Sequence, residues 1–478
     1  MADLEAVIGL EIHVQLSTRT KMFCGCALSF GDEPNVHTCP VCLAHPGVLP
    51  VPNEEAIRYA LKIAAALECD VAPRSIFHRK NYFYPDNPKA YQISQYDLPL
   101  AVEGRLGGIR IHRAHLEEDA AKTIHLGESG RIHGSGGSLV DFNRGGTPLV
   151  EIVTEPDLRS AAEAGSWARL LRTTVSQLDV SNVNMEEGSL RIDANVSVRP
   201  AGSETLGTKT ELKNMNSFRF LERGIEAELA RQRELVEVGG TVVQETLHFH
   251  PEDGSLTALR SKEEAHDYRY FPEPDLVPLA PTEAMLREAR ESLPELPEAR
   301  MRRYESELKL SAENATQLAA DPDEAAYFEA VRAKAPTVEA QTIANWVTGE
   351  LAAALRQADG GAAADSQVTP ESLATLVAMV GGKKISHGSG KQVLATLVEE
   401  GGDPAAIVER DGLAQISDSG ELESIVAAAV EANPEAAEQI RSGNQKAIGA
   451  IVGAVMKQTK GRADGGEVNR LIKEKLGA

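Results

Sequence analysis

The sequence predicts an α+β protein, in which an antiparallel sheet with helices on one side is followed by an all-α part. Several segments before residue 293 alternate between apolar and polar side chains, as do strands with one buried face. The sequence Leu-Pro-Glu-Leu-Pro-Glu at 293–298 then interrupts regular structure. After it, the chain is rich in alanine and glutamate and has helical periodicity.

Chemically active side chains concentrate before this interruption. Eleven of the twelve histidines, all five cysteines and 17 of the 21 aromatic residues precede it. We therefore expect a catalytic domain at 1–293, the first part of a helical domain at 294–365, and a helical tail domain at 366–478. A flexible stretch around Gly360 and Gly361, before Pro370, marks the second boundary.

Alternation also assigns faces to the expected strands. In the first strand, Leu10, Ile12, Val14 and Leu16 form one face, and Glu11, His13 and Gln15 form the other. A later strand places the apolar residues Leu190, Ile192, Ala194, Val196 and Val198 inward. The segments 109–118 and 150–155 are also expected to be extended, and the apolar spacing over 218–236 predicts a helix.

Bulk properties limit the classes of function. The first residues lack the basic and apolar regions of a secretory signal, and apolar stretches such as 447–456 are too short to cross a membrane. We therefore expect a cytoplasmic protein without a membrane partner. The formal net charge of −22 opposes non-specific attraction to phosphate backbones, so any nucleic-acid binding requires a local basic surface.

Four cysteines form two short pairs, Cys24-x-Cys26 and Cys39-x-x-Cys42, which are twelve residues apart. Such pairs suit a tetrahedral structural zinc ion, with His37 or His45 as a replacement for one ligand. The alternative is four reduced, buried thiols. Cys69 stands alone on a helical segment and is expected to belong to the core.

Carboxylates and histidines occur on or beside the expected strands. They are Glu11 and His13, the segment His115-Leu-Glu-Glu-Asp119, Glu151 with Glu155, and Glu186, Glu187 and Asp193. Carboxylates gathered on one sheet face repel one another unless a counter-charge is present, and Mg²⁺ supplies that charge. Any one of them alone fits a solvated surface acid equally well.

Two further segments suit phosphate or base recognition. Residues 77–96 hold six of the 21 aromatics beside Arg79, Lys80 and Lys89, which fits a nucleotide or an unstacked RNA end, or a packed loop. Residues 441–478 contain eight Lys or Arg and three Asp or Glu, around an apolar helical stripe at 448–456. This basic surface fits phosphates or a solvated face. No Walker A pattern is present, so ATP binding would use a sheet surface with metal ions.

Eight strings of sequence, in order along nearly the whole chain, resemble the B-subunit family of the heterotrimeric aspartyl/glutamyl-tRNA amidotransferases. They are 7–16 (VIGLEIHVQL), 80–86 (KNYFYPD), 115–120 (HLEEDA), 141–149 (DFNRGGTPL), 186–191 (EEGSLR), 211–218 (ELKNMNSF), 269–275 (RYFPEPD) and 443–447 (GNQKA). Long strings of this kind are far more specific than spaced single residues.

The resemblance implies a catalytic cradle similar to the glutamine synthetase fold, a helical domain and a small helical tail that engages tRNA. It implies phosphorylation by ATP of the side-chain carboxylate of Glu-tRNA(Gln), Asp-tRNA(Asn) or both, followed by amidation with ammonia. It also implies a glutaminase A subunit and a small C subunit, since this chain offers no convincing nucleophile for producing ammonia from glutamine.

Residue roles carry over by position in this sequence. Glu11, His13 and Glu118 are expected as magnesium ligands, with Glu117 as a further one. Glu151, Glu187 and Asp193 are expected to hold a second ion or position phosphate, and Lys80, Tyr82 and Asp86 to line the nucleotide or acceptor-end site. Cys24, Cys26, Cys39 and Cys42 are expected to bind zinc, and Lys446, Lys457, Lys460 and Arg462 to bind tRNA.

Two rival functions use parts of the same pattern. A metabolic ligase of the glutamine synthetase type would use free ammonia and a small acid, and would not need the basic tail. A non-catalytic tRNA-binding subunit would use the tail and the cysteines, but would leave the strand-face acids without a purpose.

Overall fold

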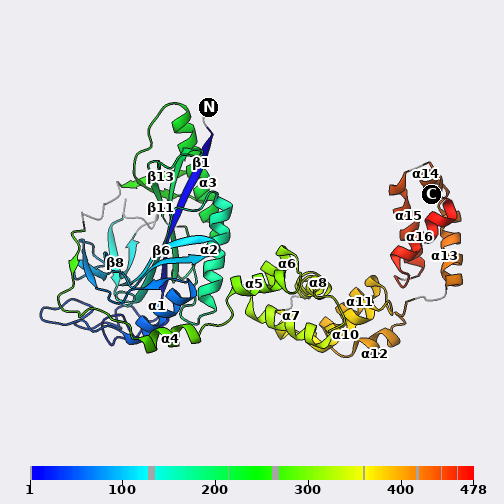
Figure 1. Cartoon of the computed structure of the whole chain (residues 1–478), viewed down its shortest axis with the longest axis horizontal. Helices are drawn as coiled ribbons and strands as arrows, with labels where there is room; N and C mark the ends of the chain where they lie inside the picture. Colours follow the sequence, from blue (N-terminus) through cyan, green and yellow to red (C-terminus); the bar gives the residue numbers. More distant parts are fainter. Residues whose placement is uncertain are drawn as a thin grey trace. The chain divides into compact units, whose positions relative to one another are not determined.

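The computed structural model describes residues 3–126, 135–213, 215–260, 268–358, 361–415, 419–442, 444–459 and 461–477. The chain forms two compact units, Met1–Glu298 and Ala299–Ala478 (Figure 1). None of the helices in the described part combines the length and the hydrophobicity that crossing a membrane requires.

A nine-stranded sheet organises the first unit, in the order β13-β12-β11-β10-β1-β9-β6-β5-β2. All neighbouring strands are antiparallel except β11 and β12. Its strands are β1 (Leu4–Gln15), β2 (Asp70–Val71), β5 (Ala101–Leu106), β6 (Ile109–Glu118), β9 (Pro148–Thr154), β10 (Leu190–Pro200), β11 (Thr210–Lys213), β12 (Thr246–Phe249) and β13 (Leu256–Arg260). The structure thus confirms a sheet-based, largely antiparallel first part followed by helices.

Helices cover the apolar face of this sheet. They are α1 (Glu54–Ala66), α2 (Ala161–Ser176) and α3 (Phe218–Glu237), and α4 (Glu283–Glu291) packs along α1. The alternation explains why: Leu10, Ile12 and Val14 are at most 1% exposed and join the same core as α2 and α3. In Figure 1, α2 and α3 lie on one side of the sheet and β8 on the other.

Two small sheets complete the first unit. One is formed by β14 (Phe271–Pro272), β3 (His78–Asn81) and β4 (Tyr91–Ser94), and the other by β7 (Lys122–Leu126) with β8 (Gly137–Asp141). Strand β4 contacts the end of β6, because the Ile93 amide donates to Glu118 and the Ser94 hydroxyl donates to Glu117. The three-stranded sheet therefore borders the polar face of the main sheet.

The second unit is helical and contains two separate hydrophobic cores. Its helices are α5 (Pro297–Ser306), α6 (Ala312–Ala320), α7 (Pro322–Lys334), α8 (Ala340–Asn345), η1 (Trp346–Leu351), α9 (Ala352–Gln357), η2 (Ala363–Asp365), α10 (Pro370–Gly381), α11 (His387–Glu400), α12 (Pro404–Arg410), α13 (Ser419–Ala432), α14 (Pro434–Arg441), η3 (Gln445–Ala447), α15 (Ile448–Gln458) and α16 (Gly465–Leu476). The first core contains residues between Tyr304 and Leu413, and the other contains residues between Leu422 and Leu476.

The first of these helical cores extends across the expected boundary at 365. Helix α10 follows the glycine- and alanine-rich stretch, yet its Leu373, Leu376 and Val377 are fully buried and join the core that begins at Tyr304. Helices on both sides of this stretch therefore belong to one core, and the next core begins only in α13.

Candidate functional site

The polar face of the main sheet brings together side chains from four adjacent strands. In the strand register, Glu11 on β1 lies opposite Asp193 on β10, and His13 lies between Arg191 on β10 and Glu151 on β9. Directly opposed residues of a sheet share a face, so these side chains are neighbours.

His13 lies at the centre of this group. Its Nε2 atom is 3.7 Å from Glu11 Oε1, 3.8 Å from Glu117 Oε1 and 3.5 Å from Glu151 Oε2. Strand β6 supplies a second imidazole, since His115 Nε2 lies 3.5 Å from Glu151 Oε2 and 3.7 Å from Glu117 Oε2. We call Glu11, His13, His115, Glu117, Glu151 and Asp193 the acid–histidine cluster.

The electrostatics of the cluster follow from crowding and burial. Burial opposes the imidazolium form, but the hydrogen bond and charge of Glu151, followed by the other carboxylates, raise the pKa of His13 to about 9. Burial also opposes ionisation of Glu151, yet the neighbouring His115, His13 and Arg113 hold its pKa well below the usual range. Burial and the charge of Glu151 raise the pKa of Glu11.

The donor atoms of the cluster fit a divalent metal ion. Two groups, Glu11–His13–Asp193 and His13–Glu117–Glu151, each have ligand atoms within 4.8 Å of one another. Carboxylate oxygens are the ligands that Mg²⁺ prefers, whereas an imidazole is an unusual one. The carboxylates are therefore the natural ligands, and His13 is either a further ligand or a hydrogen-bond donor to them.

The structure does not bring two of the sequence-predicted residues into the cluster. Glu118 follows Glu117, so strand alternation directs it away, and it pairs with Lys89 and accepts a hydrogen bond from the Ile93 amide at 2.9 Å. Glu187 is exposed and accepts a hydrogen bond of 3.0 Å from Asn182.

The three predicted nucleotide-site residues lie along the neighbouring segment. Lys80 on β3 is half-buried beside the cluster; desolvation opposes its charged form, but Tyr270, Glu117 and Glu151 raise its pKa. Its Nζ lies 4.8 Å from the ring centre of Tyr268, which packs edge-to-face with Tyr82. Burial raises the pKa of Asp86, whose backbone carbonyl accepts from the Ala121 amide.

Sequence reasoning missed the cations that surround the cluster. Lys213 Nζ lies 3.1 Å from Asp193, and Arg113 Nη2 lies 3.2 Å from Glu151. Arg191 binds both oxygens of Asp119 at 2.8 and 3.0 Å, and this pairing lowers the pKa of Asp119 to about 2 although burial opposes it. The alternation of apolar and polar residues in β10 predicts that Arg191 lies on the polar face. Its pairing with Asp119 depends on the order of the strands, which the sequence alone does not give.

The four paired cysteines also come together. All four sulfurs lie within 4.8 Å of one another, with Cys42 Sγ 4.0 Å from Cys26 Sγ and 3.9 Å from Cys39 Sγ. Four thiolates around a tetrahedral zinc, each at about 2.3 Å, have sulfurs about 3.8 Å apart. The geometry therefore fits a closed, structural zinc site, which we call the cysteine knuckle.

Neither alternative histidine ligand belongs to the knuckle group. His37 instead lies 2.7 Å from Asp32. Lys21 connects the knuckle to the segment that follows β8, because its amide donates to the Cys26 carbonyl and its buried Nζ donates to the Phe142 carbonyl at 2.8 Å. Cys69 lies in the connection between α1 and β2 and not on a helix as expected, but it does pack, half-buried, against the main core, and burial raises its thiol pKa to about 12.

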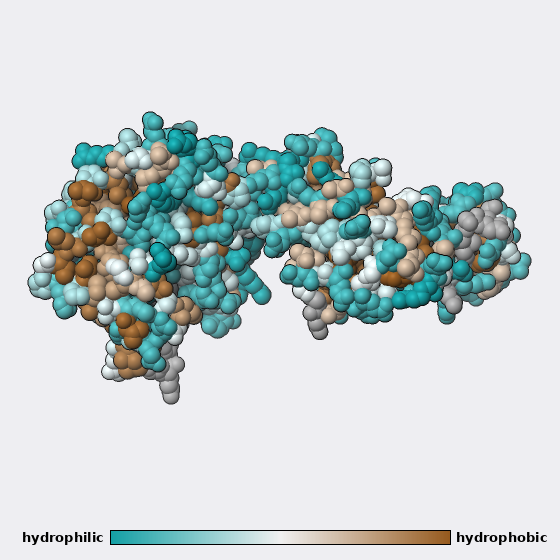
Figure 2. All heavy atoms as spheres, turned by 90° about the horizontal axis from the view of Figure 1, so that it is seen from below, coloured by the Kyte–Doolittle hydropathy of each residue, from teal (hydrophilic) through white to brown (hydrophobic). Residues whose placement is uncertain are grey.

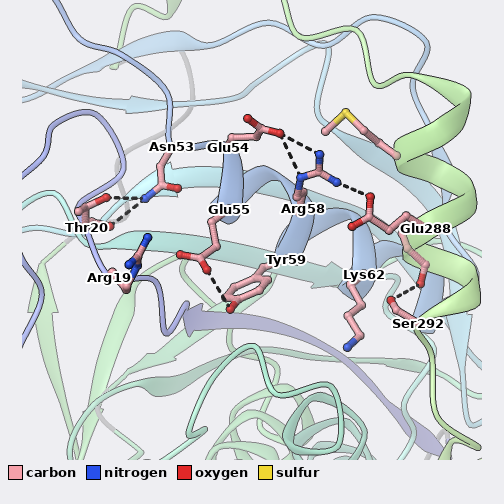
Figure 3. Close-up of a pocket in the computed structure, with 12 residues that line it drawn as sticks. Arg19, Thr20, Asn53, Glu54, Glu55, Arg58, Tyr59, Lys62, Glu288 and Ser292 are labelled. Carbon is pink, nitrogen blue, oxygen red and sulfur yellow. Dashed lines mark hydrogen bonds and ion pairs between the residues drawn. The ribbon is translucent and has the colours of Figure 1, made fainter.

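A hollow of about 710 Å³ between α1 and α4 lies outside the cluster (Figure 3). Figure 3 shows Arg58 between Glu54 and Glu288, with Tyr59 pointing to Glu55. Its charged groups largely neutralise one another, and none of the acid–histidine cluster lines it. Substitutions in this α1–α4 hollow can therefore serve as controls for substitutions in the acid–histidine cluster.

In the tail, the predicted apolar stripe is confirmed as core: Ile451 and Val455 are fully buried. Lys446 and Lys457 are exposed, and Arg462 is half-buried with its Nε donating to Thr459 at 3.2 Å. Lys460 lies outside the described residues.

Carboxylates that could hold a metal ion, on the polar face of a largely antiparallel sheet in a chain that continues into helical cores, are features of a metal-dependent enzyme with an attached binding region. Comparison with known proteins is more specific. Residues 6–287 match the GatB/GatE catalytic domain and residues 326–476 match the GatB domain.

Full-length relatives agree with these matches. The chain is 48% identical to the aspartyl/glutamyl-tRNA(Asn/Gln) amidotransferase B subunit of Persephonella marina, over 99% of this chain and 100% of the relative. It is 50% identical to that of Moorella thermoacetica, with the same coverage, and 48% identical to that of Brevibacillus brevis, over 100% and 99%. This chain belongs to the family of aspartyl/glutamyl-tRNA(Asn/Gln) amidotransferase B subunits.

The knuckle geometry predicts one zinc ion per chain. Substituting Cys26→Ser should reduce the zinc content, measured by mass spectrometry of the purified protein, and lower the melting temperature, because a tetrahedral site loses one of its four ligands. Cys69→Ser is the matched control and should keep its zinc. A wild-type chain without zinc would assign the four cysteines to reduced thiols.

The raised pKa of His13 predicts pH-dependent metal binding if this imidazole is a ligand. Only neutral imidazole binds a metal, so Mg²⁺ binding near pH 7 should release close to one proton. The affinity for Mg²⁺ should rise about tenfold per pH unit from pH 7 towards pH 9. Calorimetry in buffers of different ionisation enthalpy measures the proton release. Binding without proton release would make His13 a hydrogen-bond donor to the carboxylates instead.

Proposed function

We propose that this chain activates the side-chain carboxylate of Glu-tRNA(Gln), Asp-tRNA(Asn) or both, as a subunit of the glutamine-dependent amidotransferase. ATP would transfer its γ-phosphoryl group to that carboxylate, which gives an acyl phosphate and ADP. Ammonia would then displace phosphate and leave the amide. The acid–histidine cluster is the observation that carries this proposal, because both steps assemble several negative charges at one point.

A bound divalent metal would offset the charge of the phosphates and of the crowded carboxylates. Glu11, Glu117, Glu151 and Asp193 are the proposed ligands, with His13 among them. The set includes Glu117 instead of Glu118, because Glu117 lies in the cluster whereas Glu118 pairs with Lys89. Glu187 is left out because it is exposed and lies outside the cluster.

Cations of this chain have roles that do not depend on the metal. Lys213 and Arg113 each contact one carboxylate of the cluster and partly neutralise it. Lys80 is half-buried near Glu117 and Glu151, where a fixed positive charge would stabilise developing negative charge on the reacting groups.

We also propose that the first unit is a catalytic cradle similar in fold to glutamine synthetase. Support comes from a mainly antiparallel sheet that carries helices on one face and ionisable groups on the other. We further propose structural zinc in the cysteine knuckle and, for the tail, contact of Lys446, Lys457, Lys460 and Arg462 with tRNA phosphates.

The surface supports a partnership with A and C subunits in the cytoplasm. All the large hydrophobic side chains that the described residues expose, from Phe30 to Val277, lie in the first unit. Figure 2 shows hydrophobic residues in several separate patches on that unit. A glutaminase A subunit docked there would supply the ammonia for which this chain offers no convincing nucleophile.

ATP hydrolysis by the purified complex, with and without misacylated tRNA, tests the function. We expect stimulation by Glu-tRNA(Gln) or Asp-tRNA(Asn), and formation of the amidated tRNA when glutamine is added. Stimulation by free glutamate without tRNA would instead make this chain part of a metabolic ligase.

Replacing Glu11→Gln should lower the rate of tRNA-dependent ATP cleavage by at least about 100-fold, because one metal-binding charge is lost. The dissociation constant for tRNA, measured by filter binding, should change less than about twofold, since the tail is intact. The matched change Glu54→Gln in the α1–α4 hollow should affect neither quantity. Equal loss of cleavage and tRNA binding would make Glu11 a structural residue.

Reversing two tail charges, Lys446→Glu with Lys457→Glu, should weaken tRNA binding by about tenfold and reduce its dependence on salt by about one unit of slope per residue. Lys334→Glu, an exposed lysine on α7, is the control. Unchanged affinity and salt slope would remove these lysines from the tRNA site.

A further inference from the structure

Strand β6 contains an irregularity beside the acid–histidine cluster. Its register with β9 shifts between Ile111 and Arg113. Before the shift the buried apolar residues are Ile109 and Ile111, and after it they are Ala114 and Leu116, so the apolar positions change from odd to even numbers. His112 and Arg113 are therefore both left on the polar face, as a β-bulge allows.

These two side chains line a hollow of about 890 Å³ at the β5–β6 side of the polar face. Tyr96, Arg105, Arg110 and Glu155 line it as well. Arg113 connects the hollow to the cluster, because its guanidinium lies 3.2 Å from Glu151. We call this space the bulge hollow.

Tyr96 lines the bulge hollow and belongs to an aromatic stack. The rings of Tyr96 and Tyr270 lie 4.5 Å apart with an interplanar angle of 6°. Tyr96 is 49% exposed, whereas Tyr270 is close enough to Lys80, Glu117 and Glu151 for their charges to influence its pKa. The stack thus extends from the cluster to the solvent-accessible hollow and offers a platform for a base.

The charges of the bulge hollow suit a ligand with few phosphates. Three arginines and three carboxylates line it. Arg110 pairs with Asp157 at 2.7 Å, His112 with Glu155 at 2.8 Å, and Arg113 with Glu151. Among the described residues only Arg105 of these cations has no ion-pair partner. A triphosphate carries several negative charges and needs several unpaired cations to bind it, whereas one phosphodiester carries a single charge and needs about one.

We propose that the bulge hollow binds the 3′-terminal nucleotide of the tRNA acceptor end, with its base on Tyr96 and its phosphate near Arg105. This rests on the proposed function. In that reaction the aminoacyl carboxylate must reach the cluster while its ester bond holds the terminal ribose, and the glutamyl chain spans roughly 6 Å. The terminal nucleotide must therefore bind next to the cluster, where Arg113 joins it to the bulge hollow.

The test compares the affinity of the complex with A and C subunits for two uncharged tRNAs, one intact and one lacking the 3′-terminal nucleotide. Dissociation constants come from fluorescence anisotropy. Wild type should bind the intact tRNA about tenfold more tightly. Tyr96→Ala should abolish this ratio by weakening binding of the intact tRNA alone, and Tyr96→Phe, which keeps the ring, should retain it.

A matched arginine pair tests the phosphate contact. Arg105→Ala should reduce the ratio severalfold, whereas Arg58→Ala in the α1–α4 hollow should not change it. The melting temperature and the KM for ATP of each variant report on folding and on the nucleotide site. A raised KM for ATP with an unchanged tRNA ratio would make the bulge hollow an ATP site and overturn the proposal.

The two proposals fail in different ways. If wild type forms no amidated tRNA, the proposed function fails. If wild type is active but shows no affinity ratio, or Tyr96→Ala keeps the ratio, the assignment of the bulge hollow fails alone.

Discussion

The structure depends on neutralising the carboxylates that four strands place on one face of the main sheet. Glu11, Glu117, Glu151 and Asp193 lie within reach of one imidazole, and the sheet cannot separate them without losing its register. One histidine, two lysines and an arginine (His13, Lys80, Lys213 and Arg113) lower the repulsion, and these positive charges come from β1, β3, β11 and β6. Most of the sheet therefore contributes to one electrostatic balance.

The two faces of the main sheet also explain why ionisable groups concentrate in the first unit. The apolar face of the sheet provides the hydrophobic core, so the opposite face is free to hold ionisable groups at low exposure. The three-stranded sheet borders this polar face, where β4 donates hydrogen bonds to Glu117 and Glu118. The helical cores after residue 299 contain few such groups and leave binding to their surfaces.

Much of the fold and part of the site could be predicted from sequence. Alternation predicts the bounds of β6 and the polar side chains of β1 and β10, because both signals are local. Cysteine spacing predicts the knuckle for the same reason. The choice between Glu117 and Glu118 depends on which strands lie beside β6, and the bulge at His112 depends on register with β9. Neither feature can be predicted from the alternation of residues within a single strand. Glycines mark the expected helical boundary, but burial of Leu373 and Leu376 decides which core α10 joins.

The central position of β1 has a consequence for how this chain can change in length. β1 is paired on both sides, with β10 and β9, and its successive side chains belong alternately to the core and to the chemistry. One inserted or deleted residue within it would turn Leu10 and Ile12 outward and Glu11 and His13 inward at the same time. Length variation in a lineage of such proteins should therefore accumulate in the connecting loops, while β1 tolerates replacements but almost no gaps.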